Sequence, residues 1–206
     1  MVEKFLFDLS LAVSQHNGHL VLAERPSVRH PKNGILLNAY YTGRPRKIVV
    51  ALKKPFEEWF PRLVHESCHM DQDLEGSDVW RDLYVAHWQK DARDLILDAF
   101  EKPEQFTDSD VRDFLARVVA AERDCEERTV AKIRLWNLPI DENTYIRQAN
   151  SYLWFYAMLP SLRMWYPEGR EPYNNAEVWG LCPNHFDNDY SVVPRQLEDA
   201  YVRHCS

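Results

Sequence analysis

The stretch from residue 63 to residue 72 constrains this chain most, because it contains the pattern His-Glu-x-x-His at His65, Glu66 and His69. On a helix, two residues four positions apart lie on one face, one turn from each other, so both imidazoles can bind one metal ion. Glu66 directly follows the first histidine, and this offset suits a general base acting on a metal-bound water. The pattern predicts a helix that carries a Zn²⁺ site.

The size and composition of the chain predict one compact domain with a full core. It has 206 residues, of which 45% are hydrophobic and 28% charged. The net charge of −7 disfavours a protein whose main task is to bind nucleic acid, since that binding depends on lysine and arginine. We therefore expect no nucleic-acid partner.

The N-terminal sequence Met-Val-Glu-Lys-Phe lacks the pattern of a signal peptide, and no apolar run approaches the length of a membrane span. We expect a soluble, cytoplasmic protein with no membrane partner. The four cysteines, Cys68, Cys125, Cys182 and Cys205, form no Cys-x-x-Cys pair, so neither a zinc knuckle nor a disulfide scaffold is indicated.

Before the motif, the sequence predicts one helix and a small sheet. Residues 3–15 have helical spacing of apolar side chains, and residues 19–24, 35–41 and 47–52 are strand-like. The connections are too short for helical crossovers, so the sheet is expected to be antiparallel. Pro61 suits the first position of the metal-bearing helix, and Gly76 suits its end.

After the motif, the chain is predicted to be mainly helical. Helices are expected at residues 91–101, 107–137, 141–159 and 196–205. Residues 160–194 are rich in proline, asparagine and aromatic side chains, which is typical of a long ordered loop that walls a cleft.

Two glutamates interrupt the apolar face of the predicted helix at 107–137. Glu122 and Glu126 stand one turn apart among apolar residues, and a carboxylate that points into a core needs a partner. A metal ion is one such partner: one glutamate can be a ligand while the other accepts a hydrogen bond from a ligand histidine. The alternative is ordinary ion pairing with Arg123, Arg128 or Arg147.

The motif, followed some fifty residues later by a Glu-x-x-x-acid pattern, resembles the gluzincin group of zinc metallopeptidases. The resemblance implies that one of these glutamates is the third zinc ligand and that the acid one turn later braces a histidine. That acid is usually aspartate in the group, and here it is Glu126, which leaves the choice between Glu122 and Glu126 open. The local runs also resemble His-Glu-x-x-His proteins of tailed bacteriophages, which implies the host cytoplasm or the virion as the location.

Further candidates are weaker. Tyr152 lies at helical spacing with Tyr145 and Tyr156, and zincins commonly use a tyrosine to donate a hydrogen bond to the developing oxyanion, so Tyr152 is the candidate donor. His87 lies eighteen residues after His69, a longer spacing than in metzincins, and His185 is an isolated candidate.

Together these patterns predict an α+β fold: a mainly α-helical, zincin-like domain with a small antiparallel sheet before the His-Glu-x-x-His helix. The domain spans residues 1–206, with the first helix and sheet in 1–54, the metal-site helices in 55–160 and the aromatic loop region and last helix in 161–206.

The predicted function is zinc-dependent hydrolysis of a protein or peptide substrate, in which Glu66 activates the zinc-bound water. An alternative is a metal-stabilised structural or regulatory protein, for which a side chain such as Cys125 would fill the remaining coordination position. A third hypothesis is a metal-free interaction domain. The sequence does not indicate an oligomeric state.

Overall fold

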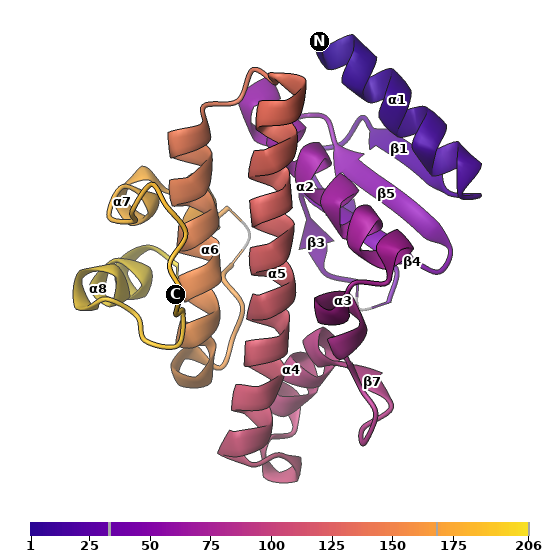
Figure 1. Ribbon diagram of the computed structural model, residues 1–206. Coiled ribbons are helices and arrows are strands. Elements are labelled where there is room, and N and C mark those ends of the chain that lie inside the picture. The colour runs from indigo at the N-terminus through magenta and orange to yellow at the C-terminus, as the bar shows by residue number, and fades with distance from the viewer. Residues whose placement is uncertain (33, 168, 206) are drawn as a thin grey trace. The chain divides into compact units, whose positions relative to one another are not determined.

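The computed structural model describes residues 1–32, 34–167 and 169–205, and it has the predicted α+β fold, mainly helical with small sheets (Figure 1). The chain forms two compact units. The first unit consists of Met1–Ser77 and Cys125–Glu142, and the second consists of Asp78–Asp124 and Asn143–Ser206. None of the helices in the described ranges is both long and apolar enough to cross a membrane.

The first unit begins with helix α1 (Val2–Gln15) and a three-stranded sheet. The strands are β1 (His19–Ala23), β4 (Ala39–Gly43) and β5 (Arg46–Ala51), in the order β1-β5-β4. β4 and β5 pair antiparallel, as predicted. β1 pairs parallel with β5 and departs from that expectation, because the chain between them first makes a second, two-stranded antiparallel sheet of β2 (Val28–Arg29) and β3 (Leu36–Leu37).

Helix α2 (Phe56–Glu75) carries the His-Glu-x-x-His motif and packs on β4 and β5. The predicted start at Pro61 was wrong, since the helix begins five residues earlier and holds Pro61 inside. The ring of Phe56 stacks on that of Phe60, 4.8 Å away, and Phe60 is fully buried. This burial offsets the hydrogen bond that an internal proline costs a helix. The predicted end was confirmed: Gly76 adopts the left-handed conformation, with φ of 59°.

Helix α5 (Asp108–Trp136) belongs to both units, the second up to Asp124 and the first from Cys125. Its start was predicted correctly. The Thr107 hydroxyl accepts a hydrogen bond from the backbone N–H of Asp110, and the Asp110 carboxylate accepts from the backbone N–H of Thr107. This reciprocal capping satisfies backbone donors that a helix otherwise leaves without partners.

The second unit contains the remaining helices. In chain order its elements are α3 (Asp78–Asp82), β6 (Tyr84–Val85), β7 (Lys90–Asp91), α4 (Ala92–Glu101), the 3₁₀ helix η1 (Pro103–Gln105), α6 (Glu142–Leu162), the 3₁₀ helix η2 (Pro172–Asn174), α7 (Ala176–Trp179) and α8 (Arg195–His204). Glu142, the first residue of α6, counts with the first unit. α7 and α8 lie beside α6 in Figure 1.

Aromatic side chains fill much of the core of the second unit. Phe155 of α6 is fully buried and contacts the rings of Trp165, Tyr166 and Tyr201. The hydroxyl of Tyr201 donates a hydrogen bond to the backbone carbonyl of Ser151 at 2.6 Å. The segment predicted as an aromatic loop therefore contributes rings to a packed interior.

Candidate metal centre

The motif side chains are buried in the first unit. His65, Glu66 and His69 retain 7%, 8% and 5% of their exposure, although two of them are basic and one is acidic. Burying groups of this kind is costly unless they are hydrogen-bonded or bind a metal. The partners of these three residues therefore decide what the buried face of α2 can do.

The Nδ1 atom of His65 lies 3.3 Å from a carboxylate oxygen of Glu126, which is itself fully buried. This is an ion-pair distance, and the imidazole carries a charge only if both of its ring nitrogens are protonated. A carboxylate beside one ring nitrogen is a common way in which proteins orient a metal-binding histidine. The role of Glu126 as the bracing acid stays a prediction.

His69 has the same arrangement with a neutral partner. Its Nδ1 atom lies 2.8 Å from the side-chain oxygen of Gln72, one turn further along α2, and Gln72 is fully buried. This contact fixes the orientation of the imidazole on α2. Sequence analysis did not identify Gln72. Its spacing of three residues from His69 was the available signal, because such residues are neighbours on a helix.

Cys125 of α5 adds a thiol to this group. Its sulfur lies 3.6 Å from Nδ1 and 3.9 Å from Nε2 of His65, and the thiol donates a hydrogen bond to the backbone carbonyl of His65 at 3.3 Å. Within the described residues, the group of side chains arranged to hold a metal ion is His65, His69 and Cys125, whose ligand atoms lie within 4.8 Å of one another.

A charged pair borders this group. The ammonium group of Lys132 on α5 contacts the carboxylate of Asp71 at 2.7 Å and donates to the hydroxyl of Ser67 at 2.8 Å. Burial raises the pKa of the neighbouring Cys68 thiol, but its hydrogen bond with Cys125 and the charge of Lys132 outweigh burial and lower that pKa overall. The α2–α5 contact in the first unit is therefore polar over several turns.

Glu122 lies in the second unit and is buried, with 6% of its exposure left. Arg93 lies within electrostatic reach of Glu122. Burial lowers the pKa of the Arg93 guanidinium, but its hydrogen bond to Asp91 and the charges of Asp91 and Glu122 outweigh burial and raise that pKa overall. Arg93 contacts Asp91 at 2.9 Å. Glu122 therefore has a positive charge nearby, from a residue that sequence analysis had not considered.

Tyr152, the predicted oxyanion donor, also lies in the second unit. Its hydroxyl accepts a hydrogen bond from Tyr156 at 3.0 Å. Burial raises the pKa of Tyr152 well above its usual value, and the charges of Tyr156 and Glu122 raise it further. The phenol therefore stays protonated at neutral pH, as a hydrogen-bond donor must. Its role in catalysis remains a prediction.

Two of the three arginines considered as alternative partners of the two glutamates have contacts elsewhere, and ion pairing with the third, Arg123, stays an alternative. Arg128 binds Glu75 at 2.7 Å, and Arg147 donates to the backbone carbonyls of Gly180 and Cys182. The positions of these two guanidinium groups are thus explained by other contacts, without ion pairs to Glu122 or Glu126.

The two remaining histidine candidates lie in the second unit, apart from the metal group. The ring of His87 contacts that of Trp88 edge-on, and His185 is exposed. The described residues bring neither into a cluster of metal-binding side chains.

Comparison with protein-family models, with curated proteins and with solved structures gives no match to this chain. The site must therefore be interpreted from its own geometry.

Proposed function

We propose that the protein is a zinc-dependent metallohydrolase that cleaves peptide bonds, with His65 and His69 as zinc ligands. One observation carries the proposal: two buried histidines one turn apart on α2 each have an oxygen close to Nδ1, that of Glu126 at 3.3 Å for His65 and that of Gln72 at 2.8 Å for His69. Contacts of this kind orient imidazoles for metal binding.

Zinc fits this set of donors. It binds imidazole nitrogen, thiolate and carboxylate oxygen, usually four-coordinate, and a catalytic zinc has three protein ligands and one open position. The two histidines supply two ligands. The third ligand is proposed to be one of the two glutamates Glu122 and Glu126, which stand one helical turn apart on α5.

When bound, zinc polarises the peptide carbonyl and lowers the pKa of water toward neutrality. Glu66 takes a proton from the attacking water and passes it to the leaving amine. Glu126 and Gln72 hold the two imidazoles in place throughout. Tyr152 is proposed to donate a hydrogen bond to the oxygen on which negative charge develops.

The proposed substrate is a protein or a peptide, which the resemblance of the motif to zinc metallopeptidases supports. A cytoplasmic location, in a host cell if the chain is encoded by a phage, and an association with virions both remain predictions.

The test of the mechanism is Glu66→Gln, which keeps the size of the side chain but removes the base. We expect the variant to retain zinc and to lose cleavage of labelled casein by roughly 10²–10⁴-fold, the usual contribution of a general base. The matched control is Glu57→Gln, because Glu57 is an exposed glutamate on the same helix. Cleavage by zinc-loaded Glu66→Gln at the wild-type rate would contradict the mechanism.

A second candidate function is a metal-stabilised structural site, and the position of Cys125 favours it. A sulfur and a nitrogen bound to one tetrahedral zinc lie roughly 3.5 Å apart by the usual bond lengths, near the 3.9 Å between the Cys125 sulfur and Nε2 of His65. Cys125→Ser distinguishes the two functions. Loss of zinc from this variant with no cleavage by the wild type supports the structural site, whereas retained zinc and retained cleavage support the hydrolase.

A further inference from the structure

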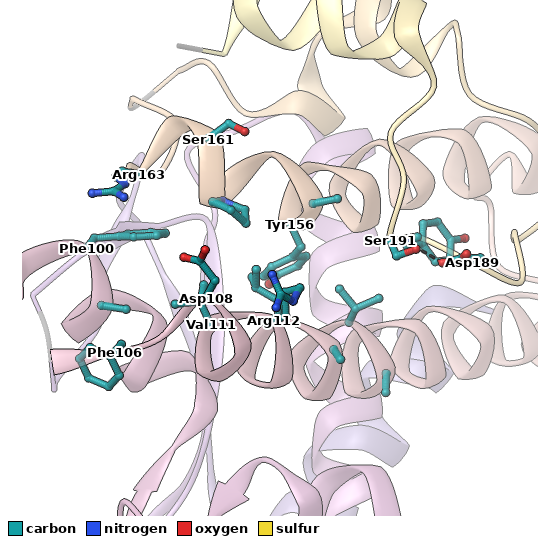
Figure 2. Close-up of a pocket in the computed structure, with 18 of the residues that line it drawn as sticks. Phe100, Phe106, Asp108, Val111, Arg112, Tyr156, Ser161, Arg163, Asp189 and Ser191 are labelled. Carbon is teal, nitrogen blue, oxygen red and sulfur yellow. Dashed lines mark hydrogen bonds between the residues drawn. The ribbon is translucent and has the colours of Figure 1, made fainter. Parts of the chain in front are cut away.

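The second unit contains a cavity of about 820 Å³ that the proposed function does not use. It is open to solvent on one side, lies along the first half of α5, and is lined also by α4, η1, the second half of α6 and residues 188–191 (Figure 2). A volume of this size is in the range of small-molecule sites, about 300–1,000 Å³.

The wall of the cavity is mainly apolar. Its larger apolar side chains are Phe100, Phe106, Val111, Leu115, Val119 and Pro160. Two tyrosines complete it, and their hydroxyl groups already have partners: Tyr156 donates to Tyr152, and Tyr190 donates to Asn150 while accepting from the backbone of Asp187. The tyrosines thus offer ring surface to a ligand, which favours an apolar body.

Charge in the lining is positive on balance. Three arginines, Arg112, Arg123 and Arg163, face two aspartates, Asp108 and Asp189. Three positive and two negative charges give +1, whereas the whole chain carries −7. The cavity therefore differs in sign from the rest of the molecule, and an anion is the favoured charged ligand.

The two aspartates have structural reasons to be there, and two of the arginines do not. Asp189 accepts hydrogen bonds from the backbone of Ser191, which lower its pKa, and Asp108 lies in the first turn of α5, where a negative charge stabilises the helix. Arg112 and Arg163 make no ion pair within the described residues. Figure 2 shows Arg112 extending from α5 toward Tyr156 of α6.

We propose that this cavity binds a long-chain carboxylate, with its alkyl chain along the apolar wall and its carboxylate at one of the two exposed arginines, Arg112 and Arg163. A guanidinium group binds a carboxylate through two parallel hydrogen bonds, which gives the site selectivity for that head group. None of the lining residues is a proposed zinc ligand or the proposed base, so neither zinc nor hydrolysis is needed to test this site.

The test is calorimetric titration of the full chain with decanoate, dodecanoate and dodecyltrimethylammonium, each below its micelle concentration. We expect saturable 1:1 binding of the carboxylates, tightening roughly fourfold for each added methylene, and at least tenfold weaker binding of the cation. Equal binding of the carboxylate and the cation, or no saturable binding of the carboxylates, would overturn the proposal.

Variants locate the ligand. Ala120→Trp and Ala116→Trp fill the cavity from α5 and should abolish binding, while Ala131→Trp, on an exposed part of the same helix outside the lining, should not. Arg112→Gln combined with Arg163→Gln should weaken dodecanoate roughly tenfold, and Arg195→Gln, at an exposed arginine outside the lining, should leave it unchanged. Unchanged dodecanoate affinity in both tryptophan variants, folded by circular dichroism, would place the ligand elsewhere and refute the site.

Discussion

The two units of this protein bury different kinds of side chain. In the first unit, α2 buries two histidines, a glutamate and a glutamine on one stretch, and Glu126 of α5 is buried with them. In the second unit, the core around Phe155 is mainly aromatic and aliphatic, and the buried polar side chains in the described residues are Glu122, Asn150 and Ser151. Burying apolar side chains stabilises the folded state. Burying polar side chains, as in the first unit, costs free energy unless they have hydrogen-bond or metal partners. A metal centre is the partner that we propose.

The largest effect that separates the two units is expected for Phe155→Ala. Removing a fully buried phenylalanine should lower the free energy of unfolding by about 3–5 kcal/mol, because it leaves a cavity among Trp165, Tyr166 and Tyr201. Urea denaturation measures this loss. The zinc content per folded chain should not change. A loss of zinc from folded Phe155→Ala would contradict the view that the core around Phe155 is not needed for metal binding.

A smaller effect is expected at the residue that orients His65. Glu126→Ala should weaken zinc binding by about 10–100-fold, since it removes the acceptor at Nδ1 while both histidines remain. Competition with a chromophoric chelator measures the affinity. Gln72→Ala removes the neutral acceptor at His69 and should weaken binding less, because hydrogen bonds between charged groups are the stronger ones.

Glu122→Ala and Glu126→Ala together decide the third ligand. If Glu126→Ala loses zinc altogether while Glu122→Ala keeps it, Glu126 is the ligand and does not only orient His65. Loss of zinc from Glu122→Ala alone makes Glu122 the ligand.

The smallest effect concerns the second unit alone and depends on pH. Burial raises the pKa of the Cys182 thiol from 9.0 to about 12. Below pH 9 the thiol is protonated in both the folded and the unfolded chain; between pH 9 and pH 12 only the unfolded chain releases the proton, so stability falls as pH rises. Between pH 8 and pH 10 we expect this thiol to lower the free energy of unfolding by roughly 1 kcal/mol.

Urea denaturation of wild type and Cys182→Ala at pH 8 and pH 10 measures that difference. The variant should show a shallower loss of stability with pH, and parallel losses in both proteins would contradict the role of the buried thiol.

Much of the fold was predictable because local signals agreed with the final structure. Thr107 and Asp110 cap α5, and Gly76 ends α2 in the left-handed conformation that glycine tolerates. The start of α2 could not be predicted from Pro61 alone. The rule that proline favours the first turn of a helix takes no account of packing, such as the stacking of Phe56 on Phe60. The parallel pairing of β1 with β5 is likewise a long-range contact between strands separated by more than twenty residues.

The two histidines of the candidate site could be predicted from the sequence, but only some of the residues that contact them could. The spacing of His65 and His69 and the acid at Glu126 were visible as a pattern on two helices. Gln72 was not identified, because a polar residue on a helix is usually solvated and its burial appears only after folding. The division of α5 between the two units at Cys125 leaves no signal, since the helical pattern runs through that point without a break.

The zinc content of the purified chain tests the central claim most directly. After equilibration with zinc and removal of the excess, mass spectrometry of the metal should find about one zinc ion per chain in the wild type and almost none in the double variant His65→Ala/His69→Ala. The double variant of exposed histidines His16→Ala/His19→Ala should match the wild type. Far less than one zinc ion in the wild type, or equal zinc in the wild type and the His65/His69 variant, would contradict the assignment of α2 as the metal-bearing helix.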